Sequence, residues 1–422
     1  MKILLSMRDS FPPQRPDVKA LFGTYLAGLG LRTDLISEST PGRPDQRGPG
    51  PHGDDAAGAA WPAGALHVRR VGRAGRLAGL IRTACFHCGA LLRHSRDVDA
   101  IQVRDQVFIG FIGLMIARIR GIKFIYWMSF PFPEGHLEMA RTRSLGFSPL
   151  RRLAGLARGK LGFFVLYRVV ARHADHVFVQ SQRMLEVIAE RGVRRERMTA
   201  VPMGVDLAQV RAAAIEPASD HRLVNGRVLV YLGALDRVRR IDFLLHVLAR
   251  VKADIPRVLL VLAGDASEPG DVQWLQREAT RIGIHGSVIW LGWVPPEQAW
   301  RYVKAAEIGL SAIPPGPLYD VSSPTKALEY MALGIPVVAT RIPDQEQVLV
   351  QSGAGVVVEY DPVAFADAIV HLLMEPGRAR AMGARGPEYV SRERDYPVLA
   401  GRVAAVYRAV LAAAAPVSLG PC

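Results

Sequence analysis

The chain has 422 residues, half of them hydrophobic, which is long enough for two α/β domains with separate cores. Its three cysteines argue against a disulfide framework and favour a reducing compartment. The net charge of +14 lies almost entirely in residues 1–220, which hold 32 basic and 19 acidic residues, so an acidic partner is expected; no helix-turn-helix, finger or stacking-aromatic pattern predicts nucleic acid.

The first half of the chain alternates apolar strands with helical segments, as a doubly wound parallel sheet does. A helix is predicted over 18–28, and strands over 2–6, 33–36, 100–103, 124–127 and 176–180. The N-terminus reads as the first strand and lacks the length and cleavage site of a signal peptide, which predicts a cytoplasmic protein. Residues 38–65, rich in Pro and Gly without periodicity, are expected to form a flexible loop or insertion.

A second series of strands follows the polar stretch PASDHRLVNG, which is interpreted as a linker. These strands are predicted over 228–232, 258–263, 288–291, 308–311, 337–339 and 355–358. We therefore expect an N-terminal Rossmann-like domain over 1–215, a C-terminal one over 216–395, and a last helix within 396–422 that packs back on the first domain. Two such domains facing each other over a central cleft would hold a ligand between them.

Basic and apolar residues are interleaved over 139–174, a stretch without any acidic residue. This pattern suits a segment lying on an anionic bilayer, and it also suits a solvated helix of an Arg-rich protein. A membrane-spanning helix is not expected, because Arg118, Arg120 and Lys123 interrupt the most apolar stretch, 107–127. The favoured prediction is a protein that lies peripherally on the inner face of the cytoplasmic membrane.

The segment SSPTKALEYMALGIPVVAT predicts a loop, a helix and a short buried strand. Ser323 suits the N-cap and Pro324 the first helical position. Such a helix offers free backbone N–H groups and the positive end of its dipole to a phosphate, and Lys326 adds a charge. Glu329 is expected one turn further on the same face as Thr325, where its carboxylate would bind both ribose hydroxyls. The segment therefore predicts a nucleotide clamp.

Further motifs precede this clamp in a fixed order: ADHVFVQS, VPMGVD, YLGALDRVRRIDFLL, VLLVLAGD, VIWLGWVPPEQ and IGLSAIP. Together with the clamp segment they resemble the retaining glycosyltransferases of the GT-B fold, family 4 (glycosyl transferases group 1). The resemblance covers nearly the whole chain and is specific from about His173 onward. It implies two Rossmann-like doubly wound domains and a hexosyltransferase that uses a nucleotide-sugar.

The resemblance implies a donor site in the second half of the chain. Glu329 matches the second glutamate of the family's pair, implied to bind the nucleotide ribose, and Arg240 matches the basic residue implied to hold the diphosphate. Transfer requires charge to be stabilised on the leaving diphosphate, a task for Arg240, Arg237 and Lys326. Helix N–H groups after Ser323 would assist, so neither a metal nor another cofactor is expected.

Two features of the donor half bear on this assignment. Ala234 follows the loop glycine, Gly233, where the family often has an arginine, so Arg237 or Arg239 is expected to substitute. Trp293 is expected either to stack near the nucleotide base or to fill a core. The diphosphate contacts therefore depend on a different arginine from the family's usual one.

Two further positions depart from the family's pattern. Val321 stands where the first glutamate of the pair would fall, and Asp320 lies one residue off register. Many family members place a histidine just after the strand that here reads FIYWMSFPFPEGH, and Ser129 lies at that point instead. Glu134 and His136 follow a few residues later and are either a polar group and a base for the reaction or ordinary loop residues.

The remaining candidates lie elsewhere in the first half. Asp17 and Lys19 follow the first strand and are candidate acceptor-side residues. The DXD pattern at 97–99 precedes a strand and is not expected to bind a metal, since the chain otherwise suits a metal-free fold. The CxxC pattern at 85–88 lacks a second pair and is more often a pair of small helix residues.

Three interpretations of the function stay open. The basic, amphipathic first half favours a transferase acting on a lipid-linked or polysaccharide intermediate of envelope synthesis, with a soluble acceptor as a variant. The departures from the family's pattern allow a degenerate protein that binds a nucleotide-sugar or lipid without transfer. A nucleotide-sugar epimerase of the same fold is the third interpretation, and it would need no acceptor.

Overall fold

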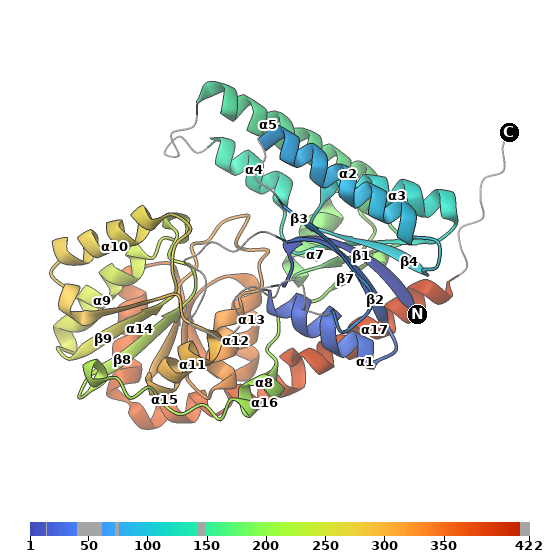
Figure 1. Ribbon diagram of the computed structural model, residues 1–422. Helices are drawn as coiled ribbons and strands as arrows, with labels where there is room; N and C mark the ends of the chain where they lie inside the picture. Colours follow the sequence, from blue (N-terminus) through green and yellow to red (C-terminus); the bar gives the residue numbers. More distant parts are fainter. Residues whose placement is uncertain (14, 40–60, 72–75, 142–147, 414–422) are drawn as a thin grey trace. The chain divides into compact units, whose positions relative to one another are not determined.

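The computed structural model describes residues 1–13, 15–39, 61–71, 76–141 and 148–413. By its internal contacts the chain divides into two compact units. One is formed by Met1–Pro202 together with the helix that begins at Tyr396, and the other by Met203–Asp395. Each unit is a parallel sheet with helices on both faces (Figure 1). The doubly wound α/β architecture predicted from the sequence is therefore confirmed.

The first unit is built on a seven-stranded parallel sheet in the order β3-β2-β1-β4-β5-β6-β7. Its strands are β1 (Lys2–Ser10), β2 (Arg32–Ser39), β3 (Leu66–Arg70), β4 (Ala100–Arg104), β5 (Lys123–Met128), β6 (His176–Val179) and β7 (Met198–Ala200). The chain adds strands outward from β1 in one direction and from β4 in the other. The adjacent strands β1 and β4 therefore form the topological switch point, where ligands bind in open α/β sheets.

Both faces of this sheet are covered by helices. They are η1 (Val18–Tyr25, a π-helix), α1 (Leu26–Gly28), α2 (Arg76–His94), α3 (Val107–Arg120), α4 (Phe132–Arg141), α5 (Pro149–Phe164), η4 (Val165–Val170), α6 (Ala171–His173), α7 (Gln182–Glu190), η5 (Arg195–Arg197) and α17 (Tyr396–Ala412). The last helix, α17, packs against η1 and α1, and the Tyr407 hydroxyl donates to Gln102 Oε1 at 2.5 Å (Figure 1). Leu5 faces this core, whereas Ser6 points to the opposite face and to His87 of α2, as expected for successive strand residues.

The second unit is built on a six-stranded parallel sheet in the order β10-β9-β8-β11-β12-β13. Its strands are β8 (Arg227–Leu232), β9 (Val258–Ala263), β10 (Val288–Gly292), β11 (Ile308–Ser311), β12 (Val337–Thr340) and β13 (Gly355–Val358). Leu229 and Tyr231 of β8 face one hydrophobic core, and Val228 and Val230 face another. The sheet is thus buried on both faces, which explains why its strands are almost continuously apolar.

The helices of the second unit precede its first strand, connect its successive strands or follow its last strand. They are α8 (Leu207–Ala212), η6 (His221–Leu223), η7 (Arg237–Arg239), α9 (Asp242–Asp254), α10 (Pro269–Arg281), η8 (His285–Ser287), α11 (Pro296–Ala305), α12 (Thr325–Ala332), α13 (Pro343–Ser352), α14 (Pro362–Met374), α15 (Pro376–Gly383), α16 (Gly386–Tyr389) and η9 (Val390–Arg394). Leu207 and Val210 of α8 are buried in a core of this unit. For that reason the division of the chain falls before Met203, earlier than the expected boundary after residue 215.

Part of the expected loop over 38–65 has a different structure. Glu38 and Ser39 belong to strand β2, because they pair with Arg69 and Arg70 of β3. Residues 40–60 lie outside the described residues.

Candidate functional site

The predicted clamp lies at the switch point of the second sheet. β8 and β11 are neighbours there, Gly233 follows β8, and the loop after β11 leads to α12. A Cβ on Gly233 would lie 3.5 Å from Cε of Lys326, so the loop after β8 meets the first turn of α12. Gly233 has a φ of 136°, and a Cβ on Gly264 would lie 2.0 Å from the Gly233 carbonyl oxygen. This close backbone approach requires glycine.

Helix α12 has Pro324 as its N-cap, and the predicted capping role of Ser323 is wrong. The Ser323 hydroxyl instead donates to Asp344 Oδ2 at 2.7 Å and accepts from the backbone N–H of Met203 at 2.9 Å. Arg394 completes this buried cluster by donating to Asp344 Oδ1 at 2.8 Å. Within the described residues no side chain caps α12, so its first N–H groups and the positive end of its dipole can meet an anion.

Lys326 lies in the first turn of α12 and contacts Tyr231 of β8. Its Nζ donates to the Tyr231 hydroxyl at 3.3 Å and lies 4.5 Å from the centroid of the ring. Burial lowers the pKa of Lys326 to about 7, an effect that Arg239 strengthens and Glu329 opposes. No ion pair to Lys326 occurs in the part of the chain that the structure describes. A bound diphosphate would supply the missing negative charge.

Glu329 lies one turn further along α12 and is held by Trp300 of α11. The indole N–H of Trp300 donates to Glu329 Oε2 at 3.0 Å. Burial raises the pKa of Glu329, and the raise is opposed first by the hydrogen bonds from Trp300 and Thr325 and then by the charge of Lys326. The carboxylate is therefore fixed in orientation, which suits an acceptor for two adjacent hydroxyls. Sequence analysis missed Trp300.

Other predicted donor contacts have different surroundings. The side chain of Trp293 is 52% exposed, and its indole makes no hydrogen bond or ring contact within the described residues. Asp320 Oδ1 accepts the backbone N–H of Gly316 at 3.2 Å and closes its own turn. Val321, in the position expected for a glutamate, is 5% exposed. The structure thus brings Glu329 and Lys326 together at the switch point, whereas Asp320 is engaged within its own turn.

The basic loop after β8 forms the 3-10 turn η7, and Arg240 follows it with a φ of 54°. Arg240 precedes α9 and pairs with Asp242 at 3.3 Å between Nε and Oδ1. The Arg237 guanidinium lies 4.4 Å from the ring centroid of Trp274. Arg239, by contrast, is the arginine whose charge acts on Lys326. The backbone of Arg240 is in the left-handed region, which is strained for a residue other than glycine, and such strain is frequent at functional sites.

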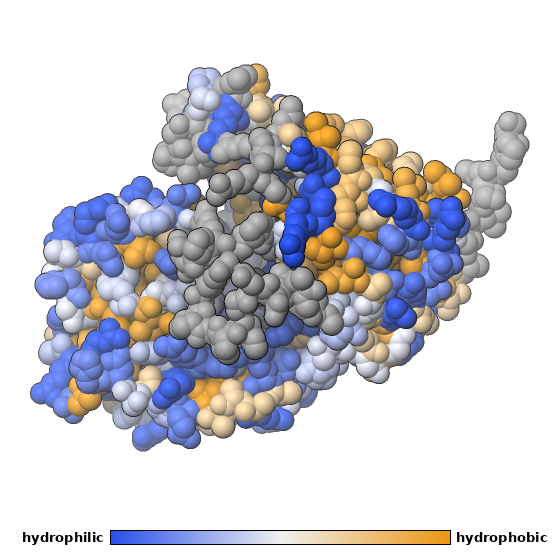
Figure 2. Space-filling model, viewed as in Figure 1, coloured by the Kyte–Doolittle hydropathy of each residue, from blue (hydrophilic) through white to orange (hydrophobic). Residues whose placement is uncertain are grey.

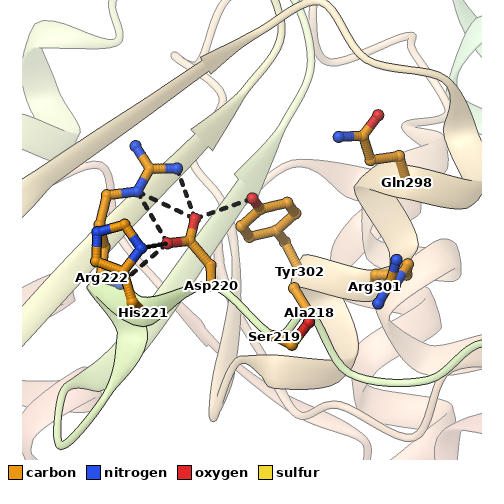
Figure 3. Close-up of a pocket in the computed structure, with 8 residues that line it drawn as sticks. All are labelled: Ala218, Ser219, Asp220, His221, Arg222, Gln298, Arg301 and Tyr302. Atoms are coloured by element: carbon orange, nitrogen blue, oxygen red, sulfur yellow. Dashed lines mark hydrogen bonds and ion pairs between the residues drawn. The ribbon is translucent and has the colours of Figure 1, made fainter.

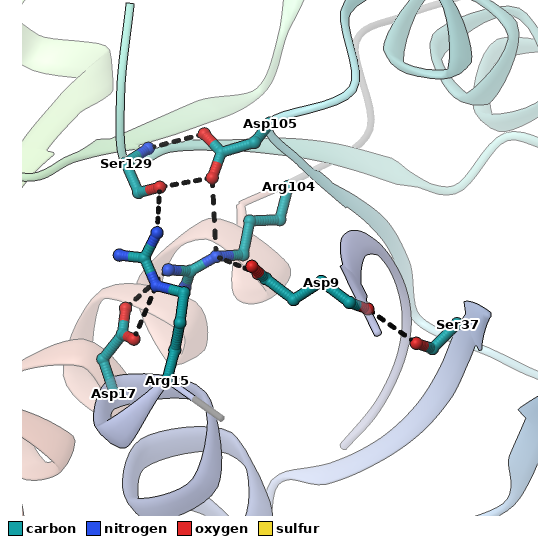
Figure 4. A network of polar contacts seen from close by, with 7 residues as sticks. All are labelled: Asp9, Arg15, Asp17, Ser37, Arg104, Asp105 and Ser129. Atoms are coloured by element: carbon teal, nitrogen blue, oxygen red, sulfur yellow. Dashed lines mark hydrogen bonds and ion pairs between the residues drawn. The ribbon is translucent and has the colours of Figure 1, made fainter. Parts of the chain in front are cut away.

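In the first unit, a buried network of charges lies at the carboxyl ends of β1, β4 and β5 (Figure 4). Arg104 is fully buried, and its Nη2 donates to Asp17 Oδ2 at 2.5 Å. Arg15 donates to Asp17 Oδ1 at 3.2 Å and to Ser129 Oγ at 3.1 Å. Asp105 accepts the backbone N–H of Ser129 at 2.7 Å and also its hydroxyl. Asp17 and Ser129, predicted from separate segments, therefore belong to one network.

The two central carboxylates of this network differ in their pKa values. Burial would raise the pKa of Asp17, but Arg104 and Arg15 hold it below its ordinary value. Burial raises the pKa of Asp105 above its ordinary value, even though Arg104 and Ser129 oppose the change. Asp105 also has a φ of 59°, which is uncommon for a residue other than glycine. A buried, strained carboxylate at the end of a strand is a candidate functional residue that sequence analysis missed.

Glu134 and His136 lie in helix α4, so their interpretation as loop residues is wrong. The helix begins at Phe132, where the following proline falls in the first turn and needs no N–H partner. Glu134 Oε1 accepts the Tyr167 hydroxyl at 2.7 Å and forms an ion pair with Arg191. Glu134 is therefore held by two partners, whereas His136 lines a cavity.

The remaining sequence candidates do not converge on either site. Lys19 is exposed on η1. Asp99 of the DXD pattern accepts the backbone N–H of Lys2 at 2.7 Å, and Cys85 and Cys88 are free thiols on α2. Among the described residues there is no group of three or more His, Cys, Asp or Glu that would hold a metal ion.

Cavities of ≈550 Å³ occur in both units. The cavity of the second unit lies beside η6 and α11 and contains none of the predicted site residues (Figure 3). In it, Asp220 accepts from Arg222 at 2.5 Å and from the Tyr302 hydroxyl at 3.0 Å, so the charge of Asp220 is paired. The cavity of the first unit lies at the switch point between β1 and β4 and is lined by both Asp105 and His136.

Comparison with known families identifies both units. The model of the glycosyl transferases group 1 matches residues 226–375, and the model of the glycosyl transferase 4-like domain matches residues 22–204. The first range contains all six strands of the second sheet, and the second range contains strands β2 to β7 of the first sheet. The chain belongs to the GT-B glycosyltransferases.

The chain spans about half the length of the curated relatives that it matches. The D-inositol 3-phosphate glycosyltransferase of Segniliparus rotundus is 30% identical over 223 residues, which are 51% of this chain and 48% of the relative. The alpha-monoglucosyldiacylglycerol synthase of Streptococcus pneumoniae is 25% identical over 253 residues, 58% of this chain and 52% of the relative.

Solved structures share the fold of this chain over nearly its whole length. HepE from Anabaena, in complex with UDP and glucose, has a TM-score of 0.68 at 16% identity and covers 97% of this chain and 100% of its own. A sucrose-phosphate synthase from Thermosynechococcus elongatus has a TM-score of 0.70 at 18% identity. It covers 98% of this chain and 100% of its own. Within the described ranges of this family member, no helix has the length and hydrophobicity needed to cross a membrane.

Proposed function

We propose that the protein transfers a hexose, with retention of configuration, from a nucleotide-diphosphate sugar to a hydroxyl of a lipid-linked or polysaccharide acceptor. The observation that carries the proposal is the uncapped N-terminus of α12, which stands beside Lys326 and one turn from Glu329. Backbone N–H groups, an ammonium without an ion-pair partner among the described residues, and an oriented carboxylate are the groups that a diphosphate and a ribose require.

The proposed reaction breaks the bond between the anomeric carbon and the diphosphate oxygen and forms one to the acceptor oxygen. The acceptor proton passes to the leaving phosphate on the same face of the sugar. Lys326, Arg239 and the first N–H groups of α12 would stabilise the charge that develops on the diphosphate, without a metal or another cofactor. Arg237 and Arg240 are exposed, so a diphosphate could replace their present contacts with Trp274 and Asp242.

The choice of substrates is supported by the similar proteins. HepE from Anabaena was solved with UDP and glucose, which favours a UDP-sugar donor. The relative from Streptococcus pneumoniae is a monoglucosyldiacylglycerol synthase, which favours a lipid acceptor. Helix α5 supports contact with an anionic membrane, because it exposes Leu153, Leu161 and Phe164 between basic residues. We therefore propose a protein of the cytoplasm that lies peripherally on its membrane.

A donor panel tests the proposal. Purified protein is incubated with UDP-, GDP- and ADP-sugars, and free nucleotide is measured with and without a bacterial lipid extract. The proposal predicts nucleotide release from one donor that rises when lipid is added. Binding without release would favour the degenerate binding protein, an interpretation that the buried Val321 in place of a glutamate keeps open. Conversion of the donor sugar without acceptor would favour the epimerase.

A further inference from the structure

The cavity of the first unit lies where a ligand is expected in a doubly wound sheet. Arg8 belongs to β1, and Asp105 and Gln106 directly follow β4, so the cavity opens at the switch point of the sheet. Its other walls come from α2, α3, α4 and α5. All of these elements belong to one compact unit, so the cavity is complete within it.

One wall of this cavity is apolar and open to solvent. Leu80 and Ile81 of α2 are 53% and 56% exposed, and Phe108 of α3 is 43% exposed. The exposed apolar side chains continue on α3 with Phe111, Met115 and Ile119, which fall on one face of the helix and extend over about 16 Å from Phe108. Figure 2 shows this hydrophobic surface over α2 and α3. A contiguous exposed patch of this kind marks a binding surface for an apolar partner.

Another part of the lining of the cavity is basic. Arg8, His136 and Arg158 line it, and the Arg8 guanidinium lies 4.5 Å from the ring centroid of Phe132. Burial lowers the pKa of His136, and the charges of Arg158 and Arg8 lower it further, so the three groups lie within electrostatic range of one another. Among the described residues no carboxylate forms an ion pair with Arg8 or Arg158.

Asp105 is the one acidic group among the described residues that line the cavity. It is already engaged by the backbone N–H and hydroxyl of Ser129 and by the buried Arg104. Within the described part of the chain the two guanidinium groups of Arg8 and Arg158 therefore have no local counter-charge. A phosphate is the anion that two guanidinium groups bind best.

We propose that this cavity binds a lipid that carries a phosphate, with the phosphate on Arg8 and Arg158 and the hydrocarbon chain along Leu80, Ile81 and Phe108. The proposal rests on the proposed function, because it names the class of acceptor that the transferase would use. An apolar chain alone would leave the guanidinium groups unpaired, and a free phosphate alone would leave the apolar wall exposed to water.

Dodecyl phosphate is a soluble probe that has both features. Full-length protein is titrated calorimetrically with dodecyl phosphate below its micellar concentration, and separately with inorganic phosphate and with dodecyl maltoside. We expect dodecyl phosphate to bind at least about tenfold more tightly than either of the others, since each lacks one of the two interactions. Equal affinity for dodecyl maltoside would mean that the cavity binds only the hydrocarbon chain and does not recognise the phosphate. Equal affinity for inorganic phosphate would mean that the hydrocarbon chain does not contribute to binding, and would contradict a lipid ligand.

Matched variants locate the bound probe. Arg158→Gln and Leu80→Ser are expected to weaken dodecyl phosphate binding about tenfold. The controls are Arg168→Gln, on an exposed arginine of η4 outside the cavity, and Leu92→Ser, on a leucine of α2 that is 51% exposed and also outside it. All four side chains are exposed, and thermal unfolding checks that each variant folds.

Equal affinity in all four variants would overturn the proposal and indicate adsorption to the surface. Because no nucleotide-sugar is present in these titrations, their outcome is independent of the donor panel. A protein that releases nucleotide but does not bind dodecyl phosphate would contradict only the proposed acceptor class.

Discussion

The indole N–H of Trp300 donates to Glu329 Oε2 across 3.0 Å, and this bond joins α11 to α12 at the edge of the predicted donor site. Glu329 carries the proposed contact to the ribose, and Trp300 determines how its carboxylate is oriented. The two residues are 29 positions apart in the chain, so only the folded second unit brings them together.

Replacement of Trp300 tests this orientation. Trp300→Phe retains a buried aromatic ring but removes the N–H donor, so the pKa of Glu329, already raised by burial, is expected to rise further. Donor affinity should fall about tenfold, the value of one hydrogen bond to a charged group. Calorimetric titration with the donor selected by the panel measures this change. Trp293→Phe, on an exposed tryptophan, is the matched control, and an equal effect of both variants would refute the orienting role.

Lys326 makes donor binding depend on pH. Its pKa is lowered from 10.5 to about 7, chiefly by burial, so the folded protein loses this proton at a pH where the unfolded chain keeps it. The free energy of unfolding should therefore rise as the pH is raised from about 7 to about 10, because the buried charge is then removed.

Diphosphate binding should have the opposite slope. It requires the ammonium form, so affinity should fall by up to about tenfold per pH unit above 7. Urea unfolding measures the first effect and calorimetric titration with the donor measures the second, each from about pH 6 to about pH 9, and Lys326→Met is expected to lack both. A wild-type affinity that stays constant over this range would contradict the role of Lys326.

Arg104 is predicted to be essential for the stability of the first unit. Arg104→Met would remove the buried cation that Asp17 and Asp105 share and leave Asp17 with Arg15 alone, at a cost of about 3–5 kcal/mol. The pKa of Asp105, already raised by burial, would then rise further above that of the unfolded chain, so the deficit should shrink as the pH is lowered towards about 5. In the wild type the lowered pKa of Asp17 has the reverse effect, and its stabilisation is lost as the pH falls below 3.8.

Urea unfolding of this variant at neutral and acidic pH measures the effect. Arg172→Met, on an exposed arginine of α6, serves as the control and should change stability by no more than about 0.5 kcal/mol. A deficit of Arg104→Met that does not depend on pH would mean that the buried carboxylates are not its cause.

Most of the fold could be predicted because its central strands are short apolar runs between helices. All six strands of the second sheet were predicted, and three of them have the bounds expected, at 258–263, 308–311 and 355–358. Two edge strands of the first sheet, β3 and β7, were missed. The first is LHVRR and mostly half-buried, and the second has three residues, so neither presents a clear apolar period. The sequence pattern that predicted a helix over 18–28 also does not distinguish the π-helix η1 from an α-helix.

The residues of the candidate donor site could be predicted only where their spacing along one helix places them on the same face. Thr325, Lys326 and Glu329 share one helical face, and the structure brings Thr325 and Lys326 to Glu329. The cap of the same helix could not be predicted, because Ser323 bonds instead to Asp344, 21 residues later. Trp300 and Asp105 were missed for the same reason, since their roles depend on neighbours distant in the chain. The sequence alone did not distinguish Trp300 from Trp293.

Membrane association is predicted to depend on both charge and apolar side chains of α5. Changing Arg151 and Arg152 to Glu should lower sedimentation with anionic vesicles more than tenfold. Each lost positive charge weakens membrane binding by about 1 kcal/mol, and reversing the sign of the charge weakens it further. Leu161→Ser combined with Phe164→Ser should also lower it, because both side chains are exposed. Arg378→Glu, in the second unit, is the charge control. Unchanged sedimentation of the variants would favour a solvated basic helix.

The central claim is that α12 binds the donor nucleotide through Glu329, and calorimetric titration of Glu329→Ala tests it most directly. Burial raises the pKa of Glu329, so its ionised form costs folding free energy and its removal should leave the fold intact. The variant is expected to unfold at a temperature close to that of the wild type and to lose at least about hundredfold in donor affinity, the value of two hydrogen bonds to a carboxylate. An affinity equal to that of the wild type would contradict the central claim.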